Sequence, residues 1–251
     1  MKEIAGKTVL IIGASRGIGA AAAQAFAREG TNLVLAARDV AAMESLAHAL
    51  PAPENVRVIR TDISCASDII RSVDYCAEQF GRLDIAFNNA GVTQKRVPFA
   101  EMTDEVFDAV MNVNVRAIFV AMKRQIALML QTGGGAIVNT GSMSSTVVMP
   151  QMGAYCTSKH ALAGMTKIAA LDYAARNIRV NLIAPGPVET AMFQGGIGAT
   201  KAGRDAVTAA TPMRRIASPE EVAEAVVWLA SPAASYITGA IVPIDGGITL
   251  A

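Results

Sequence analysis

Ser142, Tyr155 and Lys159 are the residues of this chain whose types and spacing are suited to acid–base chemistry. If Tyr155 lies at the start of a helix, Lys159 falls one turn further along on the same face. A phenol ordinarily has a pKa of about 10, and a nearby ammonium favours the phenolate and lowers that pKa. The hydroxyl of Ser142 could reach the same reacting oxygen. The three residues together predict proton transfer at an oxygen, although Tyr and Lys are also common at this spacing on helix surfaces.

A glycine-rich turn, GASRGIG, follows an apolar run at residues 8–12 and precedes an alanine-rich segment that favours a helix. Glycine permits a tight turn and lets the backbone approach a pyrophosphate, and the helix N-terminus that follows offers free N–H groups. The spacing of Gly13, Gly17 and Gly19 differs from the commoner G-x-G-x-x-G. We interpret the turn as a dinucleotide-binding loop; the alternative is that the glycines only permit the change from strand to helix.

The end of the second apolar run, at residues 32–37, bears on the choice of cofactor. An NAD-binding protein usually carries an acidic residue here, which accepts a hydrogen bond from the ribose 2′-hydroxyl. This chain has Arg38 instead, with a second arginine, Arg16, inside the glycine turn. Guanidinium groups pair with phosphate through charge-assisted hydrogen bonds. The sequence therefore predicts NADP(H) rather than NAD(H), although Asp39 beside Arg38 would weaken the positive field.

The composition indicates one domain with a large buried core. Of the 251 residues, 52% are hydrophobic and 17% charged, and the net charge of +1 provides no basic field for nucleic acid. This low charge also suggests that surface is buried between subunits. The cysteines form no CxxC pair and predict reduced thiols in a cytoplasmic protein. The isolated His48 and His160 predict no metal site, and no apolar run is long enough to predict a membrane span.

Apolar runs and helix-favouring segments alternate along the chain. We expect strands at residues 8–12, 32–37, 56–61, 83–87, 136–140, 178–183 and 240–244, and helices at 18–29, 39–50, 67–80, 103–131, 153–176 and 219–229. Strands joined by helices form a parallel sheet with helices on both faces. Pro243 predicts that the last strand lies at a sheet edge, because proline lacks the N–H that a central strand needs. The pattern predicts a single doubly wound α/β domain over residues 1–251. The Gly- and Ala-rich stretch 195–203 has no apolar period and is expected to be mobile.

Several short motifs follow one another from the first strand to the end of the chain. They are GASRGIG, the TDIS of residues 61–64, NNAG at 88–91, NVN at 112–114, Ser142, Tyr155-x3-Lys159, Pro185-Gly186 and DGG at 245–247. Each is common alone, but all of them in this order resemble the short-chain dehydrogenase/reductases. The resemblance covers essentially the whole chain. It implies a Rossmann fold with seven parallel strands, nicotinamide chemistry and a homotetramer.

The resemblance also implies catalytic roles. Tyr155 is expected to be the general acid/base, and Lys159 to lower the Tyr155 pKa and bind the nicotinamide ribose. Ser142 is expected to hold the substrate oxygen. Asn114 matches the residue whose backbone positions a water for a proton relay; the alternative is a polar residue that distorts its helix and bonds a neighbouring strand.

A set of cofactor contacts follows from the same resemblance. The expected residues are Gly13, Ser15, Arg16, Gly17, Ile18 and Gly19 in the glycine turn, Arg38, Asp62 and Ile63 near the adenosine, Asn89, Ala90 and Gly91 along the cofactor, Tyr155 and Lys159, and Pro185, Gly186, Val188 and Thr190 beside the nicotinamide. NNAG could also serve mainly to hold the sheet together.

The substrate site is expected between the catalytic residues and a set of adaptable apolar side chains. The set comprises Met143, Met149, Met152, Met192 and Phe193, together with the hydroxyls of Ser142 and Tyr155. Methionine is equally suited to ordinary core. The segment at about 190–212 is expected to be a mobile loop that orders on substrate binding.

Three functions remain open on the sequence alone. The first is an NADP(H)-dependent oxidoreductase that interconverts a ketone and a secondary alcohol on a small molecule. The second is an enzyme similar to the 3-oxoacyl-(carrier protein) reductases, which meet an acidic carrier with basic residues. Arg176 matches one such position, but residues 131–134 read QTGG and lack the other. The third is a non-catalytic NADP-binding protein, which would not need to keep Ser142, Tyr155 and Lys159 together. The sequence favours the first.

Overall fold

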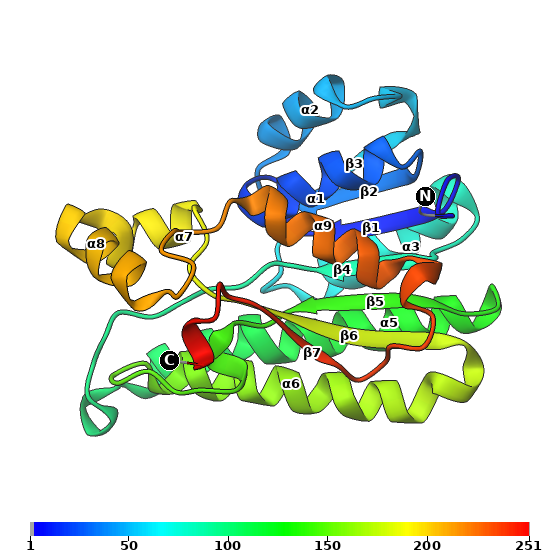
Figure 1. Cartoon of the computed structure of the whole chain (residues 1–251). Helices are drawn as coiled ribbons and strands as arrows, with labels where there is room; N and C mark the ends of the chain where they lie inside the picture. The colour runs from blue at the N-terminus through cyan, green and yellow to red at the C-terminus, as the bar shows by residue number, and fades with distance from the viewer. Residues whose placement is uncertain (1–2, 251) are drawn as a thin grey trace.

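A seven-stranded parallel sheet forms the centre of the computed structural model, which describes residues 3–250. The strands are β1 (Thr8–Ile12), β2 (Asn32–Ala37), β3 (Val56–Arg60), β4 (Ile85–Asn88), β5 (Gly135–Thr140), β6 (Ile178–Pro185) and β7 (Ile241–Ile244). They lie side by side in the order β3-β2-β1-β4-β5-β6-β7 (Figure 1). All seven expected strands are present, and Pro243 lies on an edge strand as predicted.

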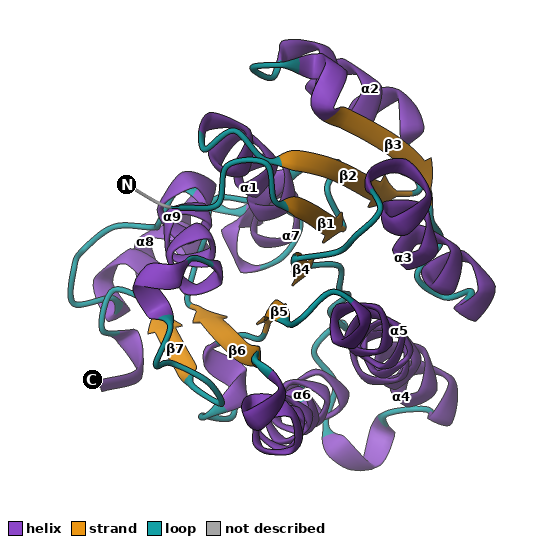
Figure 2. Ribbon diagram, turned by 90° about the vertical axis from the view of Figure 1, so that its right-hand side faces the viewer, coloured by secondary structure: helices purple, strands orange, loops and turns teal. Residues whose placement is uncertain are grey.

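Helices cover both faces of this sheet (Figure 2). On one face lie α1 (Gly17–Arg28), α2 (Val40–Ala49) and α9 (Pro219–Ala230), and on the other α3 (Ala66–Phe80), α5 (Ala117–Gln131) and α6 (Gly153–Tyr173). Successive strand residues point to opposite faces, so Val9 and Ile11 of β1 enter one hydrophobic core and Leu10 and Ile12 enter the other. The sequence prediction of a doubly wound Rossmann fold is therefore confirmed.

The long helix expected at residues 103–131 is helical throughout but not uniform. Thr103 caps α4 (Asp104–Met111) by accepting a hydrogen bond from the Val106 N–H at 3.5 Å. A π-helical turn at Asn112–Arg116 then separates α4 from α5. Single π turns interrupt α-helices mostly at functional sites. The turn holds Asn114, which is buried.

Helical segments occupy much of the stretch 195–203, where the sequence pattern predicts neither a helix nor a strand. Beyond one end of the sheet (Figure 1), α7 (Ala191–Gln194), a 3₁₀ turn (Ile197–Ala199) and α8 (Lys201–Ala210) follow one another. Threonines start both helices, because Thr190 and Thr200 accept hydrogen bonds from the N–H groups of Phe193 and Gly203. These caps outweigh the low helix propensity of glycine. The mobility of residues 190–212 stays a prediction.

None of the helices between residues 3 and 250 combines the length and apolar character that a membrane span requires.

Candidate active site

The glycine turn and the NNAG segment meet where the strand order reverses, between β1 and β4. A Cβ atom on Gly13 would lie 2.8 Å from the Ala90 nitrogen, and Gly17 has a φ of +55°. Any side chain at Gly13 would collide with the NNAG backbone, and a side chain at Gly17 would strain its own. In open α/β sheets this reversal point is the crevice in which ligands bind, at the carboxyl ends of the strands.

The predicted catalytic pair lies at the start of α6. Tyr155 is the third residue of the helix and Lys159 lies one turn on. The Lys159 ammonium is 5.7 Å from the centroid of the Tyr155 ring, and its Nζ donates to the Thr140 carbonyl at 2.9 Å. The Lys159 side chain is buried. The predicted one-turn spacing therefore brings a buried ammonium beside the phenol ring.

Ser142 is held by the 3₁₀ turn that follows β5. The Ser144 N–H donates to Ser142 Oγ at 3.1 Å, and the Ser142 N–H donates to Ser145 Oγ at 3.2 Å. Ser142 also hydrogen-bonds the Tyr155 side chain, which lowers the pKa of that phenol. The structure thus brings together all three residues with which the sequence analysis began.

The direction of the Tyr155 pKa differs from the expectation. Burial, the largest effect, raises the pKa of Tyr155, and the hydrogen bond from Ser142 opposes this rise. Burial also lowers the pKa of Lys159 to about 8. Both shifts have one cause, because desolvation disfavours the charged form of each group. In the protein alone, Tyr155 is therefore kept as a protonated phenol, the form that can donate a proton.

A continuous hydrogen-bond path joins Lys159 to the glycine turn. Lys159 donates to the Thr140 carbonyl, and Thr140 Oγ1 donates to Asn89 Oδ1 at 3.3 Å. Asn89 Nδ2 in turn donates to the Gly13 carbonyl at 3.0 Å. The path fixes Lys159 relative to the loops at the strand ends.

Asn114 uses all the polar atoms of its amide within the protein. Its Oδ1 accepts from the Val92 N–H at 2.9 Å, and its Nδ2 donates to the Val92 carbonyl at 2.9 Å and to Ser158 Oγ at 3.0 Å. A Cβ on Gly91 would lie 3.2 Å from Asn114 Oδ1 and 3.6 Å from Lys159 Nζ. The side chain thus anchors the loop that follows NNAG, in agreement with the structural alternative; the water-positioning role of its backbone stays a prediction.

The expected adenosine contacts gather at the ends of β1, β2 and β3. Arg16 and Arg38 are exposed, and neither guanidinium forms an ion pair within the part of the chain that the structure describes. Hydrogen bonds from Ser64 lower the pKa of the Asp62 carboxyl, with smaller contributions from the charges of Arg38 and Arg60. The structure therefore brings Arg38 and Asp62 near each other.

The segment expected beside the nicotinamide faces the glycine turn. A Cβ on Gly17 would lie 3.2 Å from Thr190 Cγ2, and one on Gly186 would lie 2.8 Å from Asp245 Cα. Pro185 ends β6, and Val188 forms a bridge with Ala217. Segments far apart in the sequence thus lie close together at the carboxyl ends of the strands.

Comparisons with known proteins agree with this geometry. A family model described as enoyl-(acyl carrier protein) reductase matches residues 13–249. The chain is 41% identical to the A-factor type gamma-butyrolactone 1′-reductase (1S-forming) of Streptomyces virginiae, over 97% of this chain and 96% of that protein. It is 37% identical to a 2,5-dichloro-2,5-cyclohexadiene-1,4-diol dehydrogenase of Sphingobium indicum, over 99% of both chains. The chain belongs to the short-chain dehydrogenase/reductase family.

Solved structures place the chain in the same family. Levodione reductase superposes with a TM-score of 0.94 at 32% identity, over 98% of this chain and 99% of the other. Two further structures each give a TM-score of 0.90 at 31% identity over 98% of this chain: a Brucella melitensis 3-ketoacyl-(acyl-carrier-protein) reductase with NADH, covered in full, and a Pseudomonas aeruginosa RhlG/NADP complex, covered to 97%. As a short-chain dehydrogenase/reductase, the chain is an oxidoreductase that acts on alcohol or carbonyl groups.

The residues at the reversal point fit the nicotinamide dinucleotide that this family uses. The N-terminus of α1 has Arg16 at its cap position, and no side chain there bonds the free N–H groups. Such an end attracts a pyrophosphate. Gly13 and Gly17 leave the neighbouring backbone free of side chains, so that a pyrophosphate can approach it. Within residues 3–250, no three His, Cys, Asp or Glu side chains are grouped as metal ligands.

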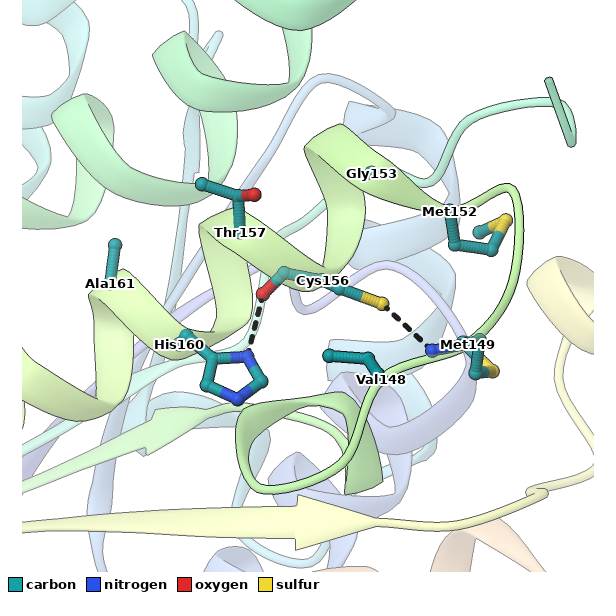
Figure 3. A pocket seen from close by; sticks show the side chains of 8 residues that line it. All are labelled: Val148, Met149, Met152, Gly153, Cys156, Thr157, His160 and Ala161. Atoms are coloured by element: carbon teal, nitrogen blue, oxygen red, sulfur yellow. Dashed lines mark hydrogen bonds between the residues drawn. The ribbon is translucent and has the colours of Figure 1, made fainter. Parts of the chain in front are cut away.

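The methionines predicted to contact substrate have varied surroundings. Met149 and Met152 line a cavity of about 540 Å³, together with Val148, Gly153, Cys156, Thr157, His160 and Ala161 (Figure 3). Neither Tyr155 nor Lys159 lines it, because helix geometry turns the Cys156–His160 side of α6 away from the catalytic side.

The other three apolar residues differ in their exposure. Met143 follows Ser142 and is half-buried, while Met192 is exposed. Phe193 is buried beneath Arg204 of α8, whose Cζ is 5.4 Å from the ring centroid. Contact of any of the five with substrate stays a prediction.

Sequence reasoning missed three residues that hold the catalytic groups. Thr140 accepts the Lys159 hydrogen bond through its main-chain carbonyl. Every residue type has such a carbonyl, so the sequence could not indicate this contact. Ser158 donates to the Tyr155 carbonyl at 2.7 Å, and Gln94 Oε1 accepts from the Tyr155 N–H at 2.9 Å. The spacing of Ser158 and Tyr155 could have indicated the first contact; nothing local to Gln94 could have indicated the second.

Proposed function

We propose that this enzyme interconverts a ketone and a secondary alcohol on a small molecule with NADP(H), and that Tyr155 is its general acid/base. The observation that carries the proposal is the arrangement of the half-buried Tyr155 beside the Ser142 hydroxyl and the buried Lys159 ammonium. A non-catalytic binding protein would gain nothing from burying an ammonium beside a phenol, because burial of charge is costly.

The proposed chemistry uses the residues in separate roles. The reduced nicotinamide, when bound, supplies the hydride. Ser142 holds the carbonyl oxygen of the substrate, and Tyr155 gives that oxygen its proton. Its raised pKa keeps the proton available at neutral pH. Lys159 favours the phenolate that remains, because an opposite charge nearby stabilises it.

The preference for NADP(H) rests on Arg16 and Arg38. Both guanidinium groups are exposed at the strand ends, where they can pair with a 2′-phosphate. Asp39 does not weaken Arg38 through an ion pair; its carboxylate instead accepts from the Ala42 N–H at 3.1 Å and caps α2. Catalytic efficiencies measured with NADPH and NADH on one substrate test this proposal, and equal values would contradict it.

The carrier-protein alternative is favoured by the likeness to a 3-ketoacyl-(acyl-carrier-protein) reductase structure and by the description of the matching family model. Arg176 is exposed at the end of the turn after α6, but the residues before β5 are glycines. A carrier-protein reductase should turn over acyl thioesters far better than simple ketones.

We further propose that the enzyme works in the cytoplasm as a homotetramer. The three cysteines are free, and Cys65 is exposed. Free exposed thiols are typical of proteins in the reducing cytoplasm, and this supports the proposed location. The exposed apolar side chains of Ile168 and Leu171 on α6 support the tetramer.

The function is tested by following NADPH oxidation with ketones, β-keto esters, diketones, steroids, sugars and acyl thioesters, for the wild type and for Tyr155→Phe. Loss of the phenolic hydroxyl should lower kcat by about 10²–10⁴-fold. NADPH binding, followed by fluorescence, should change little. Tyr173→Phe, on the last residue of the same helix, is the matched control and should keep wild-type turnover. Turnover retained by Tyr155→Phe would refute the mechanism.

A further inference from the structure

A closed ring of hydrogen bonds surrounds the start of the catalytic helix. Asn114 holds Val92 by both main-chain polar groups and donates to Ser158 Oγ. Ser158 Oγ donates to the Tyr155 carbonyl, and the Tyr155 N–H donates to Gln94 Oε1. Gln94 lies two residues beyond Val92, so the chain itself completes the ring. Both main-chain polar groups of Tyr155 are thereby bonded to side chains.

Gln94 also takes the place of a missing helix cap. The cap position of α6 is Met152, which has no side-chain oxygen to offer. The first N–H groups of a helix need partners from outside it, and Tyr155 supplies one of these groups. Gln94 Oε1, from the loop after β4, accepts it at 2.9 Å. The amide nitrogen of Gln94 lies 3.4 Å from the Lys95 carbonyl, which accepts its proton and leaves the oxygen to face Tyr155.

The loop that carries Gln94 runs along the segment before α6. The Val97 N–H donates to the Gln151 carbonyl at 3.0 Å, and Arg96 Nη1 donates to the Pro150 carbonyl at 3.3 Å. Gln151 has a left-handed backbone, with a φ of +64°, a conformation that is costly unless its surroundings hold it. These contacts pair residues 94–97 with residues 150–155 and fix the distance between Gln94 and the helix.

We propose that Gln94 is a positioning residue for catalysis, which holds the Tyr155 main chain so that the phenol meets Ser142. This inference rests on the proposed role of Tyr155 as the general acid/base. A neutral amide is suited to this role, because it accepts the N–H bond as a carboxylate would but places no negative charge near the phenol.

The charged and titratable groups around Tyr155 are few in the described chain. Lys159 lies over the ring, and Cys156 is the next residue along the helix. Lys95 and Arg96 follow Gln94 in the loop and are exposed. Ser142, on the turn that faces the phenol, carries no charge. A carboxylate at position 94 would therefore add the first anion near the phenol and disfavour the phenolate.

The test compares Gln94→Leu and Gln94→Glu with the wild type in NADPH oxidation and in the reverse reaction from pH 6 to pH 10. Gln94→Leu removes the acceptor and should lower kcat about 10-fold, which corresponds to about 1.4 kcal/mol, while KM for NADPH stays within about twofold. Gln94→Glu keeps the acceptor and should restore most of this kcat. Its profile for alcohol oxidation, which needs the phenolate, should shift upward by about half a pH unit. Gln24→Glu, the same change on an exposed residue of α1, should leave the profile in place.

Two results would overturn the inference. One is wild-type kcat in Gln94→Leu; the other is an unshifted profile in Gln94→Glu, which also decides the matter if the leucine variant does not fold. A role confined to holding the loop would lower the melting temperature of Gln94→Leu and leave the pH profile of Gln94→Glu unmoved, and it would count against the inference. The turnover of Tyr155→Phe distinguishes failure of this inference from failure of the proposed function. If Tyr155→Phe loses turnover while both Gln94 variants match the wild type, only the inference fails. If Tyr155→Phe stays active, the proposed function itself is contradicted.

Discussion

At the scale of single residues, Lys159 is a cation buried in the native state. Its ammonium donates to a main-chain carbonyl and lies over an aromatic ring, with no carboxylate among these partners. Burial lowers its pKa to about 8, so the folded protein holds this charge at a cost. Such a cost at an active site is the usual trade between stability and activity.

Lys159→Met should therefore raise the free energy of unfolding of the cofactor-free protein at pH 7, by about 3 kcal/mol from the size of the pKa shift. The unfolded lysine titrates near 10.5 and the folded one near 8. Between these values the unfolded chain binds more protons, so wild-type stability should rise with pH. The methionine variant should lack this rise. Urea unfolding at pH 7, 8.5 and 10 measures both effects.

Lys167→Met is the control, because Lys167 lies on the same helix and is exposed. It should leave both the stability at pH 7 and its pH dependence unchanged. If wild type and Lys159→Met showed the same pH dependence, Lys159 would not be titrating as the burial requires.

At the scale of elements, an ion pair between Arg204 and Glu189 joins α8 to the segment after β6. Arg204 donates to both carboxylate oxygens of Glu189 and covers the Phe193 ring. Gln194 Nε2 donates to Glu189 Oε1 at 2.8 Å. Glu189 directly precedes Thr190, which is expected beside the nicotinamide. One arginine thus ties the predicted mobile segment 190–212 to the cofactor crevice.

Arg204→Ala should loosen this segment. A half-exposed ion pair and a cation–π contact are each worth up to about 1 kcal/mol, so the opened form should become roughly 10-fold more populated. We expect a higher KM for the ketone, faster proteolysis within residues 195–203 and little change in NADPH binding. Lys201→Ala, which removes an exposed ion pair within α8, should do none of this. Equal proteolysis of wild type and Arg204→Ala would contradict the fastening role.

At the scale of the whole molecule, α6 leaves a stripe of small and apolar residues exposed. Gly164 is exposed, with open space where a Cβ would lie, and Ile168 and Leu171 are 54% and 77% exposed. The three recur at helical spacing on one face. On α5, Phe119 is 54% exposed. Apolar surface of this kind is typical of subunit contacts, which supports the proposed assembly.

Sedimentation should show a species with four times the 26.1 kDa chain mass. Leu171→Glu should shift it toward smaller species, because a buried unpaired carboxylate is costly at an interface. Ile70→Glu, on the exposed part of α3, should leave the assembly intact. A monomeric wild type would contradict the tetramer.

The sequence by itself determined the features that depend on local pattern. Buried strands, the glycine turn and the one-turn spacing of Tyr155 and Lys159 follow from residues close together in the chain, and the structure has each of them. The pattern does not predict the helices within residues 190–203, because the glycines there obscure the signal of the threonine caps.

Tertiary structure alone decided how the catalytic groups are held. The bond of Lys159 to the Thr140 carbonyl and that of Tyr155 to Gln94 join segments 19 and 61 residues apart. The direction of the Tyr155 pKa was also beyond the sequence, because it depends on how much water the surrounding elements exclude. Spacing along a chain indicates which groups can meet, whereas desolvation and main-chain contacts exist only once distant segments have packed together.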